Sequence, residues 1–294
     1  MQLDIFDDGR DLMLRNDVLN ALERRDAGAA KAAWRVLQQE FANDFSLPAL
    51  AVLIDAIAGG QATPFTDHAT LLAERAILTE HIAPAARVGF GAASGNAWLL
   101  PLWRNLAERA APLVFHQDHA EAHAAPLWLQ AGNWAAAIDA VGRIESWRHI
   151  PVPLGWMTEA RHRLDGLAAT WPLWAELAWL APRRFDMLTR RLADPLLDKL
   201  RKRFDAAFEG EGEGGDNTAD LVWFPAWVLT EQPAEARWLR GAQASRHDAP
   251  ELALRTMLEL LGLERQGRHH EVIERRKILR DTNASLYASY LRTR

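Results

Sequence analysis

Hydrophobic and polar residues alternate along this chain with the period of a helix, three to four residues, over nearly its whole length. The clearest stretch carries one apolar stripe formed by Phe185, Leu188, Leu192, Leu196, Leu200 and Phe204. Pro195 interrupts that stretch and should kink or split it. The sequence contains no run in which Val, Ile, Thr and Tyr alternate strictly with polar residues, which is the pattern of a strand. An all-α fold is therefore predicted.

Caps and loops set the expected helix boundaries. Asn16 and Asp248 are expected N-caps, because their side chains can accept from free amides of a first turn. Loops are expected at 59–60, 89–95, 150–155 and 209–217. The glycine loop 89–95 has no strand before it and no Gly-Lys-Ser/Thr, so it is predicted to be a turn between helices. The expected helices are 16–25, 28–41, 46–58, 67–82, 96–110, 113–131, 134–147, 156–169, 171–181, 183–208, 219–230, 233–244, 249–265, 269–280 and 283–292.

Three segments, 19–41, 126–144 and 258–279, share a helix–turn–helix plan. They resemble the hairpin of the tetratricopeptide repeat family, which has a Gly-x-aromatic turn, a small residue where the helices touch, and apolar residues four and seven positions later. The second segment matches with Gly132, Trp134, Ala137, Val141 and Ile144.

The first and third segments match that hairpin with departures. The first keeps Ala30, Trp34 and Leu37 but has Arg25 where the turn glycine would stand. The third keeps Gly267 and Leu279, but has Val272 in place of the small residue and Arg276 in place of the apolar one. The resemblance implies an irregular, TPR-like α-solenoid of antiparallel helical hairpins, in which each hairpin buries its apolar face on the next. It also implies a scaffold that binds a protein or peptide partner.

Length and composition narrow the picture further. The chain of 294 residues is long enough for one large core, and a single helical-repeat domain over 1–294 is expected, with a flexible insertion or soft joint at 209–217. Cysteine is absent, which excludes disulfides, thiolate metal sites and cysteine nucleophiles.

The start of the chain is acidic, unlike a secretory signal. The apolar run 221–229 is far shorter than the roughly 20 residues of a membrane span. A cytoplasmic protein of bacterial type, without membrane contact, is expected. The net charge of −5 argues against nucleic acid as a general partner.

One histidine cluster invites a catalytic interpretation. On the expected helix 113–131, His116, His119 and His123 share a face, and two of them have the spacing that lets imidazoles reach one zinc ion. Glu121 points away from that face, and no carboxylate ligand is evident. The structural alternative is a polar, partly exposed helix face. We therefore expect no cofactor and no catalytic residue.

Three functions stay open, and the first is favoured. It is a noncatalytic helical-repeat scaffold for protein–protein interaction. The second is a metal-dependent or small-molecule enzyme that uses the histidine face, which would need His68, His81 or His162 within reach of that face. The third is an RNA-associated repeat that uses the basic segments 183–203 and 265–280. The 13 tryptophans are expected mostly in the core.

Overall fold

The structure is a computed structural model in which residues 4–60, 62–208, 218–243 and 248–294 are described. Every regular element in those residues is a helix, so the all-α prediction is confirmed. Contacts divide the chain into two compact units, unit 1 (Met1–Asn133) and unit 2 (Trp134–Arg294). The single domain over 1–294 stays a prediction, and the joint expected at 209–217 lies outside the described residues. None of the described helices is long and apolar enough to cross a membrane.

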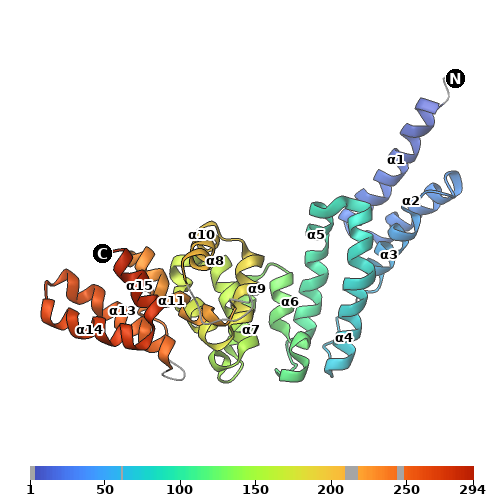
Figure 1. Ribbon diagram of the computed structural model, residues 1–294. Helices are drawn as coiled ribbons and strands as arrows, with labels where there is room; N and C mark the ends of the chain where they lie inside the picture. The colour runs from blue at the N-terminus through green and yellow to red at the C-terminus, as the bar shows by residue number, and fades with distance from the viewer. Residues whose placement is uncertain (1–3, 61, 209–217, 244–247) are drawn as a thin grey trace. The chain divides into compact units, whose positions relative to one another are not determined.

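Unit 1 consists of helical segments joined by short turns (Figure 1). They are α1 (Asp4–Glu23), α2 (Ala27–Glu40), α3 (Leu47–Ala58), α4 (His68–Ile77), the π-helix η1 (Leu78–Ile82), α5 (Ala83–Ala110), the 3₁₀-helix η2 (Gln117–Ala122) and α6 (Ala124–Gln130). The prediction that Asn16 caps the first helix is wrong, because α1 begins a dozen residues earlier. Leu14 is buried and extends the apolar stripe upstream of Asn16.

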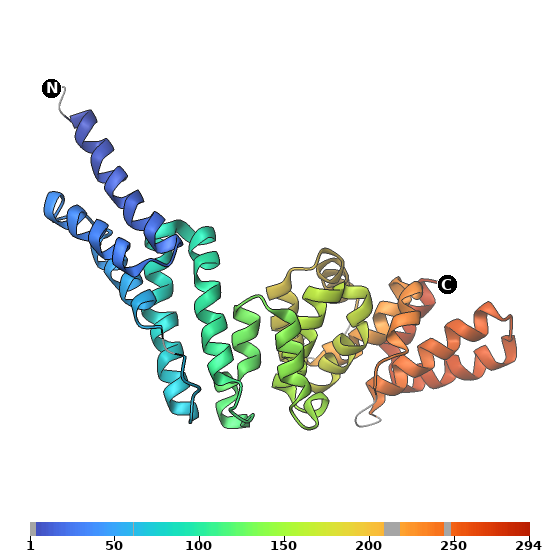
Figure 2. The ribbon, with the colours of Figure 1, turned by 180° about the vertical axis from the view of Figure 1, so that it is seen from behind.

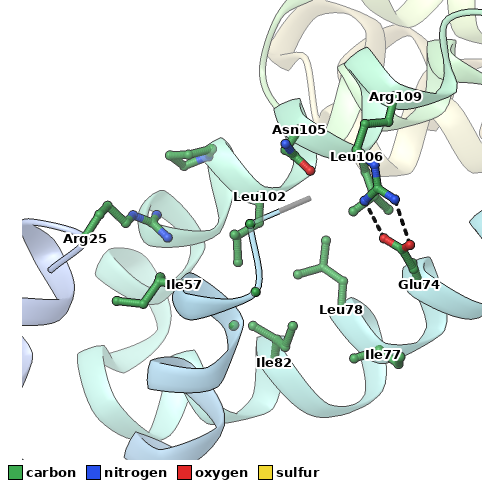
Figure 3. A pocket seen from close by; sticks show the side chains of 14 residues that line it. Arg25, Ile57, Glu74, Ile77, Leu78, Ile82, Leu102, Asn105, Leu106 and Arg109 are labelled. Atoms are coloured by element: carbon green, nitrogen blue, oxygen red, sulfur yellow. Dashed lines mark hydrogen bonds and ion pairs between the residues drawn. The ribbon is translucent and has the colours of Figure 1, made fainter. Parts of the chain in front are cut away.

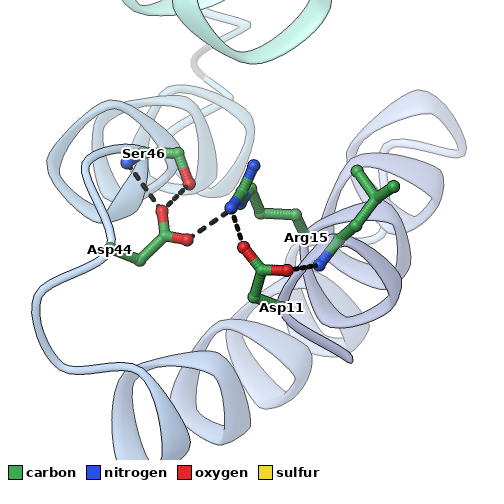
Figure 4. A network of polar contacts seen from close by, with 5 residues as sticks. Asp11, Arg15, Asp44 and Ser46 are labelled. Atoms are coloured by element: carbon green, nitrogen blue, oxygen red, sulfur yellow. Dashed lines mark hydrogen bonds and ion pairs between the residues drawn. The ribbon is translucent and has the colours of Figure 1, made fainter. Parts of the chain in front are cut away.

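The first three helices pack as successive hairpins, and a polar network fastens α1 to the start of α3 (Figure 4). Arg15 Nε donates to Asp44 Oδ2 at 2.8 Å, and Arg15 also pairs with Asp11. The other oxygen of Asp44 accepts from the amide and hydroxyl of Ser46 at 2.8 and 2.5 Å. Burial raises the pKa of Asp44, but the bonds from Ser46 and Arg15 outweigh it and lower that pKa.

A longer hairpin follows. α4, η1 and the first arm of α5 continue one another up to Phe90, and Gly91 (φ 76°, ψ 174°) then breaks the helix. The second arm, 92–110, runs back beside the first in both views (Figures 1 and 2). A Cβ on Gly95 would lie only 2.7 Å from the carbonyl oxygen of Ala86, so glycine is what lets the two arms approach. A turn between helices is therefore present within 89–95, but it is confined to Gly91, and the other residues of the predicted loop are helical.

Unit 2 begins in the turn of the second repeat-like segment. Its elements are α7 (Trp134–Gly142), η3 (Trp147–His149), α8 (Pro151–Leu180), α9 (Pro182–Leu192), α10 (Pro195–Ala207), η4 (Ala219–Trp223), α11 (Phe224–Glu231), η5 (Pro233–Glu235), α12 (Ala236–Leu239), α13 (Ala249–Arg265), α14 (His269–Thr282) and α15 (Ala284–Arg292). Gly166 (φ 79°, ψ 175°) breaks α8 as Gly91 breaks α5. The predicted boundary near residue 170 therefore lies a few residues too late.

Pro195 splits the predicted helix 183–208 into α9 and α10. Asp194 caps α10 by accepting from the amides of Leu196 and Leu197, both at 3.0 Å. Because the new helix starts with a different rotation, Leu197 is fully buried whereas Leu196 is 36% exposed. Leu197 therefore replaces Leu196 in the buried stripe, whereas Leu200 and Phe204 are buried as predicted.

Candidate functional site

The three repeat-like segments turn in the same way. The residues at the aligned turn position have positive φ angles: 56° for Arg25, 68° for Gly132 and 69° for Gly267. In each turn the amide at this position bonds to a carbonyl three residues back, and the next amide bonds to one five residues back. This is the Schellman pattern of helix C-termini. The three aligned turns therefore share one backbone geometry.

The aligned side chains are structural. Ala30, Ala137 and Val272 are buried where the second helix of each hairpin starts, and Leu37, Val141, Ile144 and Leu279 are buried further along. Trp34 donates from Nε1 to the carbonyl of Leu47 at 3.0 Å. Trp134 is half-buried, and the guanidinium carbon of Arg163 lies 5.8 Å from the centroid of its ring. Ala30 and Leu37 therefore help to pack α2 against α1, and Val272 and Leu279 help to pack α14 against α13.

The helix predicted over 113–131 is wrong. His116 lies in extended chain before η2, His119 has non-helical angles within it, and α6 begins only after His123. The buried His123 caps that helix, because its Nδ1 accepts from the amide of Ala125 at 3.1 Å. Pro126 fits the first turn of α6, where its missing N–H costs nothing, whereas it would break a longer helix.

One of the proposed additional ligands does approach. The ring centroid of His68 lies 6.4 Å from that of His116 and 5.9 Å from that of His119, but its Nε2 bonds to the carbonyl of Val114 at 2.9 Å. His81 is exposed on η1, and His162 lies in unit 2 beside Trp174 and Asp194. Within the described parts of the chain, no group of three or more His, Asp or Glu side chains is arranged to hold a metal ion.

His123→Ala is expected to lower the free energy of unfolding by about 1 kcal/mol, because it removes the cap of α6. His116→Ala is the control, since the side chain of His116 is 58% exposed and should change stability by less than about 0.5 kcal/mol. Urea unfolding of both variants measures the difference. Equal stabilities of the two variants would show that His123 is not the cap.

Several cations of the two basic segments form ion pairs with nearby carboxylates. In 183–203, Arg190 and Arg201 both pair with Asp186, at 2.9 and 3.3 Å. In 265–280, Arg268 pairs with Glu271 at 2.6 Å, and Arg275 with Glu259 at 2.8 Å. Cations engaged in this way offer little charge to a phosphate backbone.

The strongest candidate site is a pocket of about 400 Å³ within unit 1, which we call the unit 1 pocket (Figure 3). It lies among the end of α3, the α4–η1 segment and the second arm of α5. Its lining residues are Arg25, Ala56, Ile57, Gly59, Gly60, Glu74, Ile77, Leu78, Ile82, Pro101, Leu102, Asn105, Leu106 and Arg109. Aliphatic side chains form the middle, and charged groups stand toward its ends. Such apolar concavities with few polar groups are typical of ligand sites.

The π-helix shapes one wall of this pocket. Leu78 and Ile82, its first and last residues, both face the pocket. The amide of Ala83 bonds to the carbonyl of Leu78, five residues back. The next residue, Pro84, has no backbone N–H donor, and in an α-helix its ring would clash with the carbonyl four residues earlier. This explains why the helix widens to a π-helix here. Single π turns of this kind occur frequently at functional sites.

One end of the pocket is closed by a complete ion pair. Arg109 is buried and donates to both carboxylate oxygens of Glu74, at 2.5 and 2.8 Å. Its Nε also donates to the carbonyl of Thr63 at 2.9 Å, and its guanidinium carbon lies 4.0 Å from the ring centroid of Phe65. Glu74 and Arg109 therefore satisfy one another and fix α4 against α5.

Arg25 stands at the other end. Its guanidinium carbon lies 4.1 Å from the ring centroid of Trp98, and its Nη2 donates to the backbone carbonyl of Trp98. The indole Nε1 of Trp98 in turn donates to the carbonyl of Leu22 at 3.1 Å. Burial lowers the pKa of Arg25, although an arginine stays charged near neutral pH. No carboxylate of the described residues forms an ion pair with it.

Sequence reasoning missed the pocket, although it noticed Arg25 in place of a turn glycine. Comparisons of the chain with protein-family models, with curated proteins and with solved structures found no match.

Proposed function

We propose that this chain is a noncatalytic helical-repeat scaffold, an irregular TPR-like α-solenoid that binds a peptide segment of a partner protein, in a bacterial cytoplasm. The shared Schellman turn of three hairpins supports the repeat architecture. The partner-binding role rests on one observation, the unit 1 pocket.

The pocket suits a chain segment because it is apolar and open to solvent. Ile77 is 51% exposed although it lines the pocket, and Gly59, Gly60 and Pro101 are exposed at its edge. Burying an apolar side chain that is exposed to water beside an apolar pocket is energetically favourable. Aliphatic side chains of a peptide would fill the middle, as anchor residues do in helical grooves.

The two other functions lack a favouring observation. The His68, His116 and His119 rings gather without the arrangement of a metal site in the described residues. Several arginines of the basic segments are paired with carboxylates. The binding role is therefore the function that the geometry supports best.

Ile77→Asp should weaken peptide binding about 10- to 100-fold, because it places an unpaired charge where an apolar contact forms. Peptides are first selected on the wild-type chain from a random display library, and their dissociation constants are then measured by fluorescence anisotropy. Leu252→Asp is the matched control, since Leu252 is a 49% exposed leucine of unit 2 in the first turn of α13, where an acid is tolerated.

The control should leave every dissociation constant unchanged. Selected peptides that bind Ile77→Asp as tightly as the wild type would contradict the proposal, as would a library that yields no binder.

A further inference from the structure

The unit 1 pocket carries an uncompensated positive charge. Its charged lining residues are Arg25, Glu74 and Arg109, and the last two form a closed pair. Arg25 is half-buried and has no carboxylate partner among the described residues. Its Nε and Nη1 have no acceptor there either, since only Nη2 is engaged, by the carbonyl of Trp98. A partly desolvated cation of this kind attracts an anion strongly.

The backbone at Arg25 supports a role beyond the turn itself. Arg25 has a φ of 56°, a left-handed conformation that costs a non-glycine residue about 1–2 kcal/mol. The two aligned turns have glycine at this position and the same hydrogen bonds, so the turn does not require arginine. Strained non-glycine residues cluster at active sites and ligand sites.

Trp98 determines where that charge is presented. The indole face lies under the guanidinium, and the Trp98 carbonyl holds Nη2, so the side chain has little freedom left. Figure 3 shows Arg25 at one end of the row formed by Ile57, Leu102 and Leu78, with the Glu74–Arg109 pair at the other end. A preorganised cation beside an apolar strip matches a ligand that carries a carboxylate beside aliphatic groups.

We propose that Arg25 is the anion-recognition residue of the unit 1 pocket, and that the occupant is a partner peptide with an Asp or Glu side chain next to aliphatic side chains. This inference rests on the proposed function and specifies its ligand. The carboxylate accepts from Nη1 of Arg25, one of the two donors that the Trp98 carbonyl leaves free. The aliphatic groups lie on Ile57, Leu78 and Leu102.

The experiment uses random peptides displayed with their C-termini fused to the carrier, so that every carboxylate in the library belongs to a side chain. A second library with free C-termini is screened in parallel. Selected peptides are synthesised with the acid and with the matching amide, and their dissociation constants are measured on the wild type, Arg25→Gly and Arg25→Lys.

We expect the fused library to yield peptides with an acid close to aliphatic residues. Arg25→Gly and the acid-to-amide change should each weaken binding by about 10-fold or more, and Arg25→Lys by less, because lysine keeps the charge but not the planar donors. The two losses should not add, because each removes one side of the same pair. Thermal unfolding should show that Arg25→Gly stays as stable as the wild type to within about 1 kcal/mol, since glycine relieves the left-handed strain.

Three results would overturn the inference. Peptides that lose affinity on Ile77→Asp but bind Arg25→Gly unchanged would leave the pocket as the site and remove Arg25 from recognition. Binders from the free C-terminal library alone would assign the carboxylate to a chain terminus. A clear loss of stability in Arg25→Gly with unchanged peptide preference would make the residue purely structural. Peptides that ignore Ile77→Asp altogether would refute the proposed function itself.

Discussion

Gly95→Ala is expected to destabilise the protein by about 1–3 kcal/mol, although alanine favours helix over glycine. The new Cβ would lie 2.7 Å from the oxygen and 2.9 Å from the carbon of the Ala86 carbonyl. These are backbone atoms of the opposite arm, so relief requires the two arms of α5 to separate. Because the second arm carries Leu102, Leu106 and Arg109, the unit 1 pocket should also lose its shape.

Gly142→Ala is the control for this prediction. Gly142 ends α7, and a Cβ there would meet nothing within 4 Å. We expect this variant to be neutral or stabilised by up to about 1 kcal/mol. Urea unfolding compares the two glycines directly. If Gly95→Ala were as stable as Gly142→Ala, the close approach of the two arms would be wrong.

Phe224→Ala should cost about 3–5 kcal/mol, the loss typical of a buried aromatic side chain. Phe224 is fully buried at the start of α11. Its ring centroid lies 5.4 Å from that of Phe185 on α9, 5.5 Å from that of Phe204 on α10 and 6.1 Å from that of Trp227. The ring therefore joins three helices of unit 2, and its removal leaves a cavity among them.

Phe45→Ala tests whether burial is the cause. Phe45 is 71% exposed, and its loss should change stability by less than about 1 kcal/mol. Thermal and urea unfolding of both variants give the comparison. Similar losses from the two phenylalanines would contradict the core assigned to unit 2.

Most helices could be predicted because their cause is local. Apolar periodicity marks the buried face of a helix, and proline and glycine mark its ends. Pro195 correctly predicted a break, and the glycine loop around Gly91 correctly predicted a turn. Pro126 carries the same kind of signal against one helix over 113–131, and Gly166 carries it for the break within α8.

The unit 1 pocket could not be predicted in the same way. A pocket forms where the faces of neighbouring helices are not in contact, and local sequence does not determine which faces these are. The spacing of these helices is set by contacts distant in sequence, such as Glu74 with Arg109 and Arg25 with Trp98. One sequence signal was available. The tripeptide Pro-Leu-Trp occurs at 101–103, 126–128 and 172–174, and its first copy places Pro101 and Leu102 in the pocket wall. This recurring tripeptide is therefore the sequence signal that marks the pocket helix.

Methyl NMR spectroscopy with a selected peptide tests the central claim most directly, which is that the unit 1 pocket binds a partner segment. The full chain is labelled at isoleucine and leucine methyl groups and titrated with the peptide. We predict shift changes at Ile57, Ile77, Leu78, Ile82 and Leu102, and none at Leu254 or Leu261, which are buried in unit 2. Shift changes confined to unit 2, or a bound peptide that leaves the five pocket residues unchanged, would contradict the account.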